Sequence, residues 1–202
     1  MESEFTENLE EALNVHFEPL EARCLGILLS CFVGCEIISY KEIPMKGEAK
    51  NETILLAYDE RAIIPCSGGK GAEWQTRSLS CMPEEAYFMP RISRRLVVDA
   101  SMTGRFDSMD SMQRLWEDVY PEDAETAIEL FSTLMKHTRN TILEAGLIAA
   151  IARSIRFSKD LHDIVDAAGL LGIISPHSRA TTVQGLSWYQ INPTLFWEQG
   201  KK

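Results

Sequence analysis

The sequence predicts an α+β protein in two domains, an acidic helix-plus-antiparallel-sheet domain at residues 1–118 and a mainly helical domain at residues 119–202. The first indication is the change of pattern at Pro121, where helices interleaved with short β-type runs give way to a series of helices and a β-rich end. The second is the charge. Residues 1–123 hold 12 Lys and Arg against 23 Asp and Glu, whereas residues 124–198 hold 6 against 7.

The composition is that of a globular protein whose core is large enough to need no disulfide bonds. Hydrophobic residues make up 45% of the chain, and its 5 cysteines are expected as reduced thiols. We see neither a signal peptide nor an apolar run of the roughly 18 residues that a membrane span needs. We therefore expect a soluble cytoplasmic protein that does not bind membranes. Its net charge of −10 repels nucleic acid at long range unless basic groups are clustered.

The front domain begins with two predicted helices. Residues 6–16 place Leu9 and Leu13 among acidic residues, and this amphipathic helix is a candidate dimer element. Pro19 suits the first turn of the second helix, and residues 20–33 are apolar on nearly every side, which is typical of a buried helix.

Short β-type runs are predicted to follow these helices, with the second and third joined as a hairpin through residues 59–61. The runs are residues 36–43, 54–58, 62–65 and 94–100. Residues 101–111 have no periodicity and predict a loop. An alternative for the front domain is a degenerate winged helix, since two helices precede a hairpin.

Three arginines form a small basic cluster near the last of these runs. On a strand, Arg91 and Arg95 point to one face and Arg94 to the other. A salt-bridged surface and a contact to phosphate or a partner are both compatible with this cluster.

Three cysteines lie in or near the predicted buried helix. Cys24, Cys31 and Cys35 are spaced i, i+7 and i+11, which places them on one face of a continuous helix. Together with Cys66 or Cys81 they would supply thiolates for zinc or an iron–sulfur cluster, although no Cys-x-x-Cys pair is present. Core packing is the alternative, and we expect no metal and no cofactor.

Three helices are predicted in the back domain. The first is residues 123–136, and the second is residues 141–156, which begins with the capping-box spacing of Thr141 and Glu144. Ser158 is a suitable N-cap for the third.

A two-stranded hairpin follows Gly172, the residue that stops the third helix. Its first strand begins at residues 173–174. A polar segment follows, and the second strand spans residues 186–191. Three helices followed by a hairpin is the order of a winged helix-turn-helix domain, which we predict for residues 119–202.

The segment from the third helix through the hairpin reads AGLLGIISPHSRATTVQGLSWYQINP and contains Arg179-Ala180-Thr181. This segment resembles the recognition helix and wing of the MarR-like family of winged-helix regulators. The resemblance implies that Arg179 lies near the wing tip and reaches a DNA minor groove. His177 stands where that family has an acidic residue, and the following strand is longer and more aromatic. The front 120 residues resemble nothing in that family.

Six residues are predicted to contact nucleic acid. They are Arg153, Arg156 and Lys159 as phosphate contacts, His162 on the outward side of the third helix, and His177 and Arg179 in the wing. That outward side also carries Asp163 and Asp166, which repel phosphates. His162 and Asp166 are expected to form a surface pair. Solvated surface charge is the alternative for the basic groups.

These observations give three hypotheses, none of them enzymatic, because no nucleophile elbow and no ligand-spaced histidines occur. The first is a DNA-binding transcription regulator, expected to be a homodimer. The second is a winged-helix adaptor that binds a protein partner and no DNA, favoured by the acidic charge with Asp163 and Asp166. The third is a cysteine-based metal or redox protein. The regulator comes first because winged helices most often serve that purpose, which is an analogy at the level of the fold.

Overall fold

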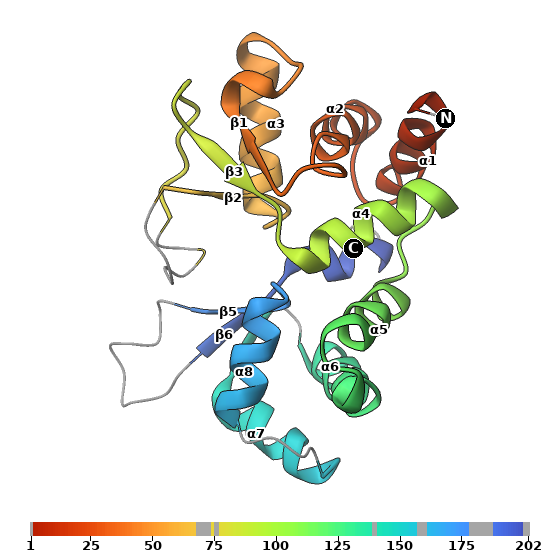
Figure 1. Ribbon diagram of the computed structural model, residues 1–202, viewed down its shortest axis with the longest axis vertical. Coiled ribbons are helices and arrows are strands. Elements are labelled where there is room, and N and C mark those ends of the chain that lie inside the picture. The colour runs from red at the N-terminus through yellow and green to blue at the C-terminus, as the bar shows by residue number, and fades with distance from the viewer. Residues whose placement is uncertain are drawn as a thin grey trace.

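In the computed structural model the chain forms helices around two small antiparallel sheets, so the predicted α+β class is confirmed (Figure 1). The structure describes residues 2–67, 74, 77–138, 141–156, 161–177 and 188–199. Figure 1 shows two halves stacked along the long axis, with helix α4 and the end of the chain between them. Within the described residues, no helix has the length and apolarity that a membrane crossing requires.

The first half is built around a three-stranded sheet, and the middle strand of this sheet comes last of the three in the sequence. Its elements are α1 (Glu2–Leu13), α2 (Pro19–Ser30), β1 (Ile37–Ser39), the 3₁₀ turn η1 (Tyr40–Glu42), α3 (Gly47–Asp59), β2 (Ile64–Pro65) and β3 (Ala86–Phe88). Strand β3 pairs antiparallel with both β1 and β2, so that Tyr87 lies opposite Ile38 and Pro65. Pro19 opens α2 as predicted, and Leu25, Leu28 and Leu29 are fully buried. The helix ends at Ser30 and is not buried on every side, because Leu20 is 74% exposed and Arg23 is exposed.

Two helices lead from the first half into the second. They are α4 (Arg91–Thr103) and α5 (Ser108–Val119). The buried residues Ile92, Leu96 and Ala100 recur every four positions, and this face of α4 packs against α1 and α5. The carboxylate of Asp107 caps α5 by accepting a hydrogen bond from the Asp110 amide at 3.0 Å.

The second half repeats the element order of the first. Its elements are η3 (Pro121–Asp123), α6 (Ala124–His137), β4 (Ile142–Glu144), α7 (Ala145–Ser154), α8 (Leu161–Leu170), β5 (Ile174–Pro176), β6 (Trp188–Ile191) and the 3₁₀ segment η5 (Pro193–Gln199). Strand β6 lies between β4 and β5, with Tyr189 opposite Leu143 and Pro176. From α2 and from α6 alike, the order is helix, strand, two helical segments and two strands, with the last strand in the middle of the sheet.

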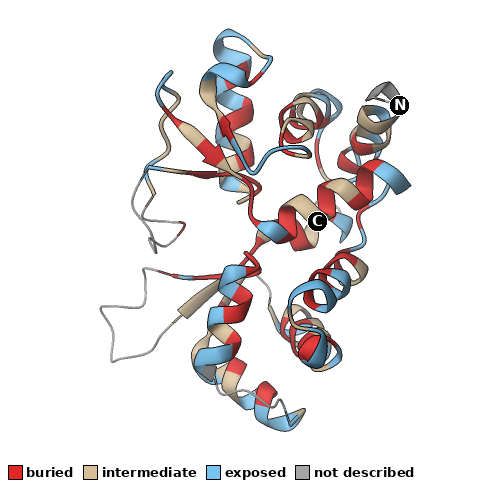
Figure 2. Cartoon of the chain, viewed as in Figure 1, coloured by how far each residue is buried: buried red, intermediate tan, exposed pale blue. Residues whose placement is uncertain are grey.

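A single hydrophobic core runs through both halves, and the end of the chain belongs to it. Trp197 is fully buried and packs edge-on against Phe17 and Phe106, with ring centroids 5.5 and 5.2 Å away. Its Nε1 donates to the Glu60 carboxylate at 3.0 Å. Figure 2 shows buried residues along the inward faces of the helices and exposed residues outside. Residues near the C-terminus therefore help to hold the helices of the first half.

A buried polar network around Asn192 joins the halves. The Asn192 amide nitrogen donates to the Gly172 carbonyl at 3.0 Å and to Ser93 Oγ at 3.1 Å. Its amide oxygen accepts from the backbone N–H and the hydroxyl of Thr194 at 3.0 and 2.8 Å. Asn192, Ser93 and Thr194 are completely buried, so their hydrogen bonds have no water to replace them. The Ile92 amide adds a second link by donating to the Leu171 carbonyl at 2.9 Å.

Three predictions for the front domain are wrong. Residues 54–58 belong to helix α3 and form no hairpin strand, because Thr53, Ile54 and Ala57 are buried at helical spacing. Residues 94–100, predicted as a strand, belong to α4. The predicted loop at residues 101–111 contains the end of α4 and the start of α5. Of residues 36–43, predicted as extended, only β1 is a strand.

The back domain follows its prediction more closely. The predicted helix at residues 141–156 is divided into β4 and α7. Thr141 is not the N-cap, because α7 begins at Ala145 with Glu144 in the N-cap position, and the Thr141 carbonyl accepts from the Ile191 amide at 2.7 Å beside the sheet. Helix α8 and strands β5 and β6 lie where they were predicted, and Gly172 follows α8 with a φ of +73°. Ser158, the predicted N-cap, lies outside the described residues.

Candidate functional site

The predicted phosphate contacts lie at the end of α7. Arg153 is in the last turn of this helix and Arg156 lies two residues beyond it, and both side chains are exposed. Arg156 has a φ of +55°, so the chain turns sharply there. Lys159 and Arg179, the other two long basic residues of the predicted nucleic-acid set, lie outside the described residues.

The two histidines of that set have different surroundings. His162 is exposed on α8, and its Nε2 lies 3.4 Å from a carboxylate oxygen of Asp166, which confirms the predicted surface pair. His177 is buried, and its backbone amide donates to the Trp188 carbonyl at 2.9 Å at the base of the β5–β6 connection. Its position places the imidazole in the interior and offers little of it to a DNA backbone.

The outward faces of α3 and α8 are acidic. These two helices hold the same place in the element order of the two halves. Exposed acidic residues on them are Glu48, Glu52 and Asp59 in α3 and Asp163 and Asp166 in α8. The one lysine of α3, Lys50, is buried and donates to the Ile43 carbonyl at 3.0 Å, and this burial lowers the pKa of its ammonium.

The cysteines do not form the predicted single-faced set. Helix α2 ends at Ser30, so Cys35 does not continue the helical face that carries Cys24, and that prediction is wrong. Burial raises the pKa of the Cys31 thiol, which makes its thiolate less available. All five cysteines are free thiols, and the described residues contain no cluster of three or more His, Cys, Asp and Glu that fits a metal ion.

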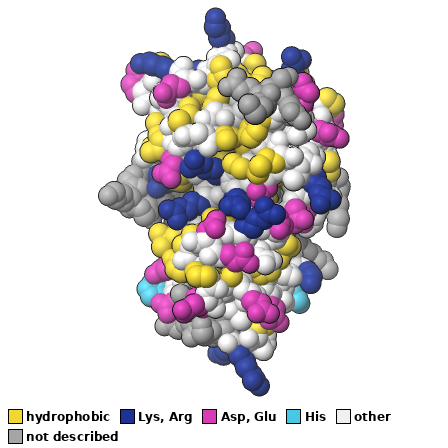
Figure 3. Space-filling model, turned by 45° about the vertical axis from the view of Figure 1, so that its right-hand side comes forward, with side chains coloured by type: hydrophobic (Ala, Val, Ile, Leu, Met, Phe, Trp, Pro, Cys, Tyr) yellow, Lys and Arg dark blue, Asp and Glu magenta, His cyan; other side chains and the backbone are white. Residues whose placement is uncertain are grey.

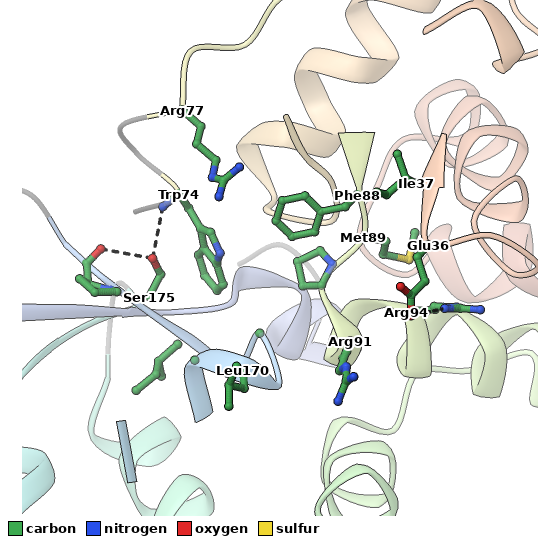
Figure 4. A pocket seen from close by; sticks show the side chains of 15 residues that line it. Glu36, Ile37, Trp74, Arg77, Phe88, Met89, Arg91, Arg94, Leu170 and Ser175 are labelled. Atoms are coloured by element: carbon green, nitrogen blue, oxygen red, sulfur yellow. Dashed lines mark hydrogen bonds and ion pairs between the residues drawn. The ribbon is translucent and has the colours of Figure 1, made fainter. Parts of the chain in front are cut away.

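A groove of about 490 Å³ lies between the two halves. Strands β1 and β3 and the start of α4 line one side, and the end of α8 together with β5 lines the other. Figure 4 shows Trp74 and Ser175 on one side of this space, Phe88 and Ile37 on the other, and Leu170 below them. The Trp74 amide donates to Ser175 Oγ at 3.2 Å, so the groove wall joins the two halves.

Among the described residues, the charged side chains that line this groove are three arginines and one glutamate. Arg94 donates to the Val33 carbonyl at 3.2 Å and lies 3.6 Å from Glu36. Arg77 donates to the Pro65 carbonyl at 2.9 Å, with its guanidinium 5.3 Å from the centre of the Phe88 ring. Arg91 is exposed and makes no hydrogen bond or ion pair with the described residues. The groove is therefore positively charged in a chain whose net charge is −10.

The arginine cluster recognised in the sequence is divided between two environments. On helix α4 the spacing of Arg91, Arg94 and Arg95 is i, i+3 and i+4, so a strand geometry does not apply. Arg95 forms ion pairs of 3.2 Å with Asp99 and Asp118, whereas Arg91 and Arg94 line the groove. Figure 3 shows a band of Lys and Arg side chains across the middle of one face, with Asp and Glu side chains beside it.

Arg77, Ile37 and Leu170 belong to none of the sites that the sequence predicts. These residues are far apart in the chain and come together only because the two halves dock. One available signal was the spacing of Ile92, Leu96 and Ala100, which indicates a helix and would have placed Arg91 and Arg94 on one side of it.

A sequence profile of a protein family of unknown function matches residues 7–199, which is nearly the whole chain. The chain belongs to this family. No curated protein and no solved structure matches it. Two features of this chain bear on its function. They are the groove between the halves and the acidic faces of α3 and α8.

Proposed function

We propose that this protein is an adaptor, a non-enzymatic module of two winged-helix-like halves that binds another protein and does not read DNA sequence. The repeated order of helix, strand, two helical segments and two strands supports a winged-helix architecture for each half. The docked halves share one core, which supports their action as one rigid unit.

The observation that carries the proposal is the acidic outward face of α3 and of α8. In helix-turn-helix proteins the helix in this position enters the major groove and offers Arg, Lys, Asn or Gln to the bases. Here Glu48 and Glu52 are exposed on α3, and Asp163 and Asp166 on α8. Each carboxylate brought near DNA phosphates adds repulsion, and the net charge of −10 adds to it at long range.

The first test measures DNA binding directly. Fluorescence anisotropy of mixed-sequence duplex DNA is recorded with the full chain across a salt series, beside the variant D163N/D166N. We expect no binding by the wild type at 150 mM salt, and a gain at low salt in the variant because repulsion is removed. Wild-type binding tighter than about 1 µM that falls steeply with salt would overturn the adaptor proposal.

The second test identifies the partner. The tagged full chain is crosslinked in its own cells, and the captured proteins are identified by mass spectrometry and then purified. We expect one of them to form a stoichiometric complex with the purified chain in size-exclusion chromatography with light scattering. A second copy of this chain is a possible outcome, and it would give the predicted homodimer.

A DNA-binding regulator is the second candidate, and one observation favours it. Arg153 and Arg156 are both exposed at the end of α7, close in sequence to α8. If they contact phosphates, R153A/R156A will weaken duplex binding and reduce its salt dependence. The same anisotropy series therefore separates the two candidates.

A further inference from the structure

We propose that the groove between the two halves binds an extended segment of the partner protein in which an acidic residue lies next to a large apolar residue. The inference rests on the proposed adaptor function, and it names the surface and the chemistry that the partner must have.

The carboxylate subsite is centred on Arg91. Arg94 and Arg77 are held in place through the carbonyls of Val33 and Pro65, so two of the three cations are fixed before a ligand arrives. Arg91 has no partner among the described residues, and it stands at the first turn of α4, where the helix dipole favours a negative group. A carboxylate gives Arg91 the bidentate pairing for which a guanidinium is suited.

The apolar subsite lies at the edges of the groove. Ile37 from β1 is 58% exposed and Leu170 from α8 is 69% exposed, and both line the groove. Phe88 and the buried Trp74 form its walls (Figure 4). Two large apolar side chains exposed on opposite sides of one groove favour a surface that a partner covers. An apolar residue of an extended segment would contact both sides while its acidic neighbour reaches Arg91.

The surroundings favour a protein segment over nucleic acid. Helix α8, whose end lines the groove, exposes Asp163 and Asp166, and these carboxylates together with the net charge of −10 repel a long polyanion. A single carboxylate has no such extended charge, and the described charged residues that line the groove are three arginines and one glutamate. The volume of about 490 Å³ is within the range of sites that hold a few side chains.

The test uses a random 12-residue peptide library displayed on phage and selected on the immobilised full chain. We expect the selected peptides to share an Asp or Glu next to Leu, Ile, Phe or Trp. The most enriched peptide is synthesised with a fluorescein label, and its Kd is measured by anisotropy against the wild type and the variants R91E, R91K and L170S.

Arg91→Glu is expected to weaken peptide binding at least about tenfold, because it replaces attraction by repulsion, and Arg91→Lys is expected to retain part of the affinity. The variant should fold, since a glutamate suits the first turn of a helix and Arg91 is exposed. Arg23→Glu is the matched control, because it makes the same charge change at an exposed helical arginine outside the groove. It is expected to leave the Kd unchanged.

No enrichment, enriched peptides without an acidic residue, or equal binding by Arg91→Glu and the wild type would overturn the inference. The failure of the adaptor proposal gives a different result. If the purified partner binds but R91E and L170S have no effect on its affinity, the groove assignment fails and the adaptor function stands. If the wild type binds duplex DNA with steep salt dependence and binds neither peptide nor protein, both fail.

Discussion

Gly172 lies so close to Pro90 that a Cβ added to the glycine would be 2.6 Å from the Cβ of Pro90. This contact joins the end of α8 to the start of α4, beside the hydrogen bond from the Ile92 amide to the Leu171 carbonyl. Gly172 also has a φ of +73°, which a residue with a side chain adopts only with strain. One glycine therefore sets how closely the two halves approach.

Gly172→Ala is expected to destabilise the protein by two effects. The left-handed backbone costs about 1 kcal/mol for alanine, and the contact with Pro90 adds about 1–3 kcal/mol of overpacking. Urea unfolding measures the sum. Gly47→Ala is the control, because Gly47 has a φ of +63° and an added Cβ there meets nothing within 4 Å. Equal losses in the two variants would contradict the close contact.

Asn192→Ala should cost about 3 kcal/mol of unfolding free energy, because it leaves buried Ser93 and Thr194 with fewer hydrogen bonds and removes the donor to Gly172. Asn51→Ala provides a comparison, since Asn51 accepts from the Tyr40 hydroxyl at 2.8 Å on the exposed surface. We expect Asn51→Ala to lower the free energy of unfolding, measured by chemical denaturation, by less than about 1 kcal/mol. A similar small loss for Asn192→Ala would show that the network adds little to docking.

Because the Tyr87 phenol is buried, we expect the protein to lose stability at alkaline pH. Burial raises the pKa of this fully buried phenol above its ordinary value of 10.0, and its hydroxyl donates to the Ser80 carbonyl. The folded protein then keeps a proton that the unfolded chain releases. The contribution of this proton to the free energy of unfolding is fully present below pH 10. It is lost by about 1.4 kcal/mol per pH unit as the pH rises from 10 toward the pKa of Tyr87 in the folded protein.

The variant Tyr87→Phe isolates this effect. At pH 7 it should be less stable than the wild type by about 1 kcal/mol, because the Ser80 carbonyl loses its donor. Above pH 10 the difference should shrink and then reverse, as measured by urea unfolding at several pH values. A difference that stays constant from pH 7 to pH 11 would rule out Tyr87 as its source.

The continuous core predicts that the two halves do not fold separately. Trp197 packs against Phe17 and Phe106, and its indole donates to Glu60, so the first half lacks part of its core without the end of the chain. We expect the full chain to unfold in a single transition by circular dichroism and tryptophan fluorescence. Fragments 1–118 and 119–202 should show no cooperative transition. A cooperative melt of either fragment alone would establish it as an independent domain.

The spacing of apolar residues predicted helices in the regions of α6, α7 and α8, whereas α4 and much of α3 were mistaken for strands. Val97 and Val98 favour a strand by propensity, yet Leu96 and Ala100 bury the helical face of α4 against α1. In α3, the β-branched Ile54 likewise favours a strand by propensity, yet it is buried on the helical face with Thr53 and Ala57. The groove was beyond prediction for another reason. Arg77, Arg91 and Leu170 share no local spacing, and only the docking of the two halves brings them together.

In both sheets the middle strand is the last of its half to be synthesised, and this determines when each sheet can close on the ribosome. The first sheet is complete in sequence at Phe88, whereas the second waits for Ile191, about 100 residues and about 5–20 s of translation later. Asn192 and Trp197 follow directly, so Phe17, Ser93 and Phe106 wait as long for these partners. During this interval the growing chain presents apolar side chains that chaperones recognise, and a chain truncated before β6 would keep presenting them.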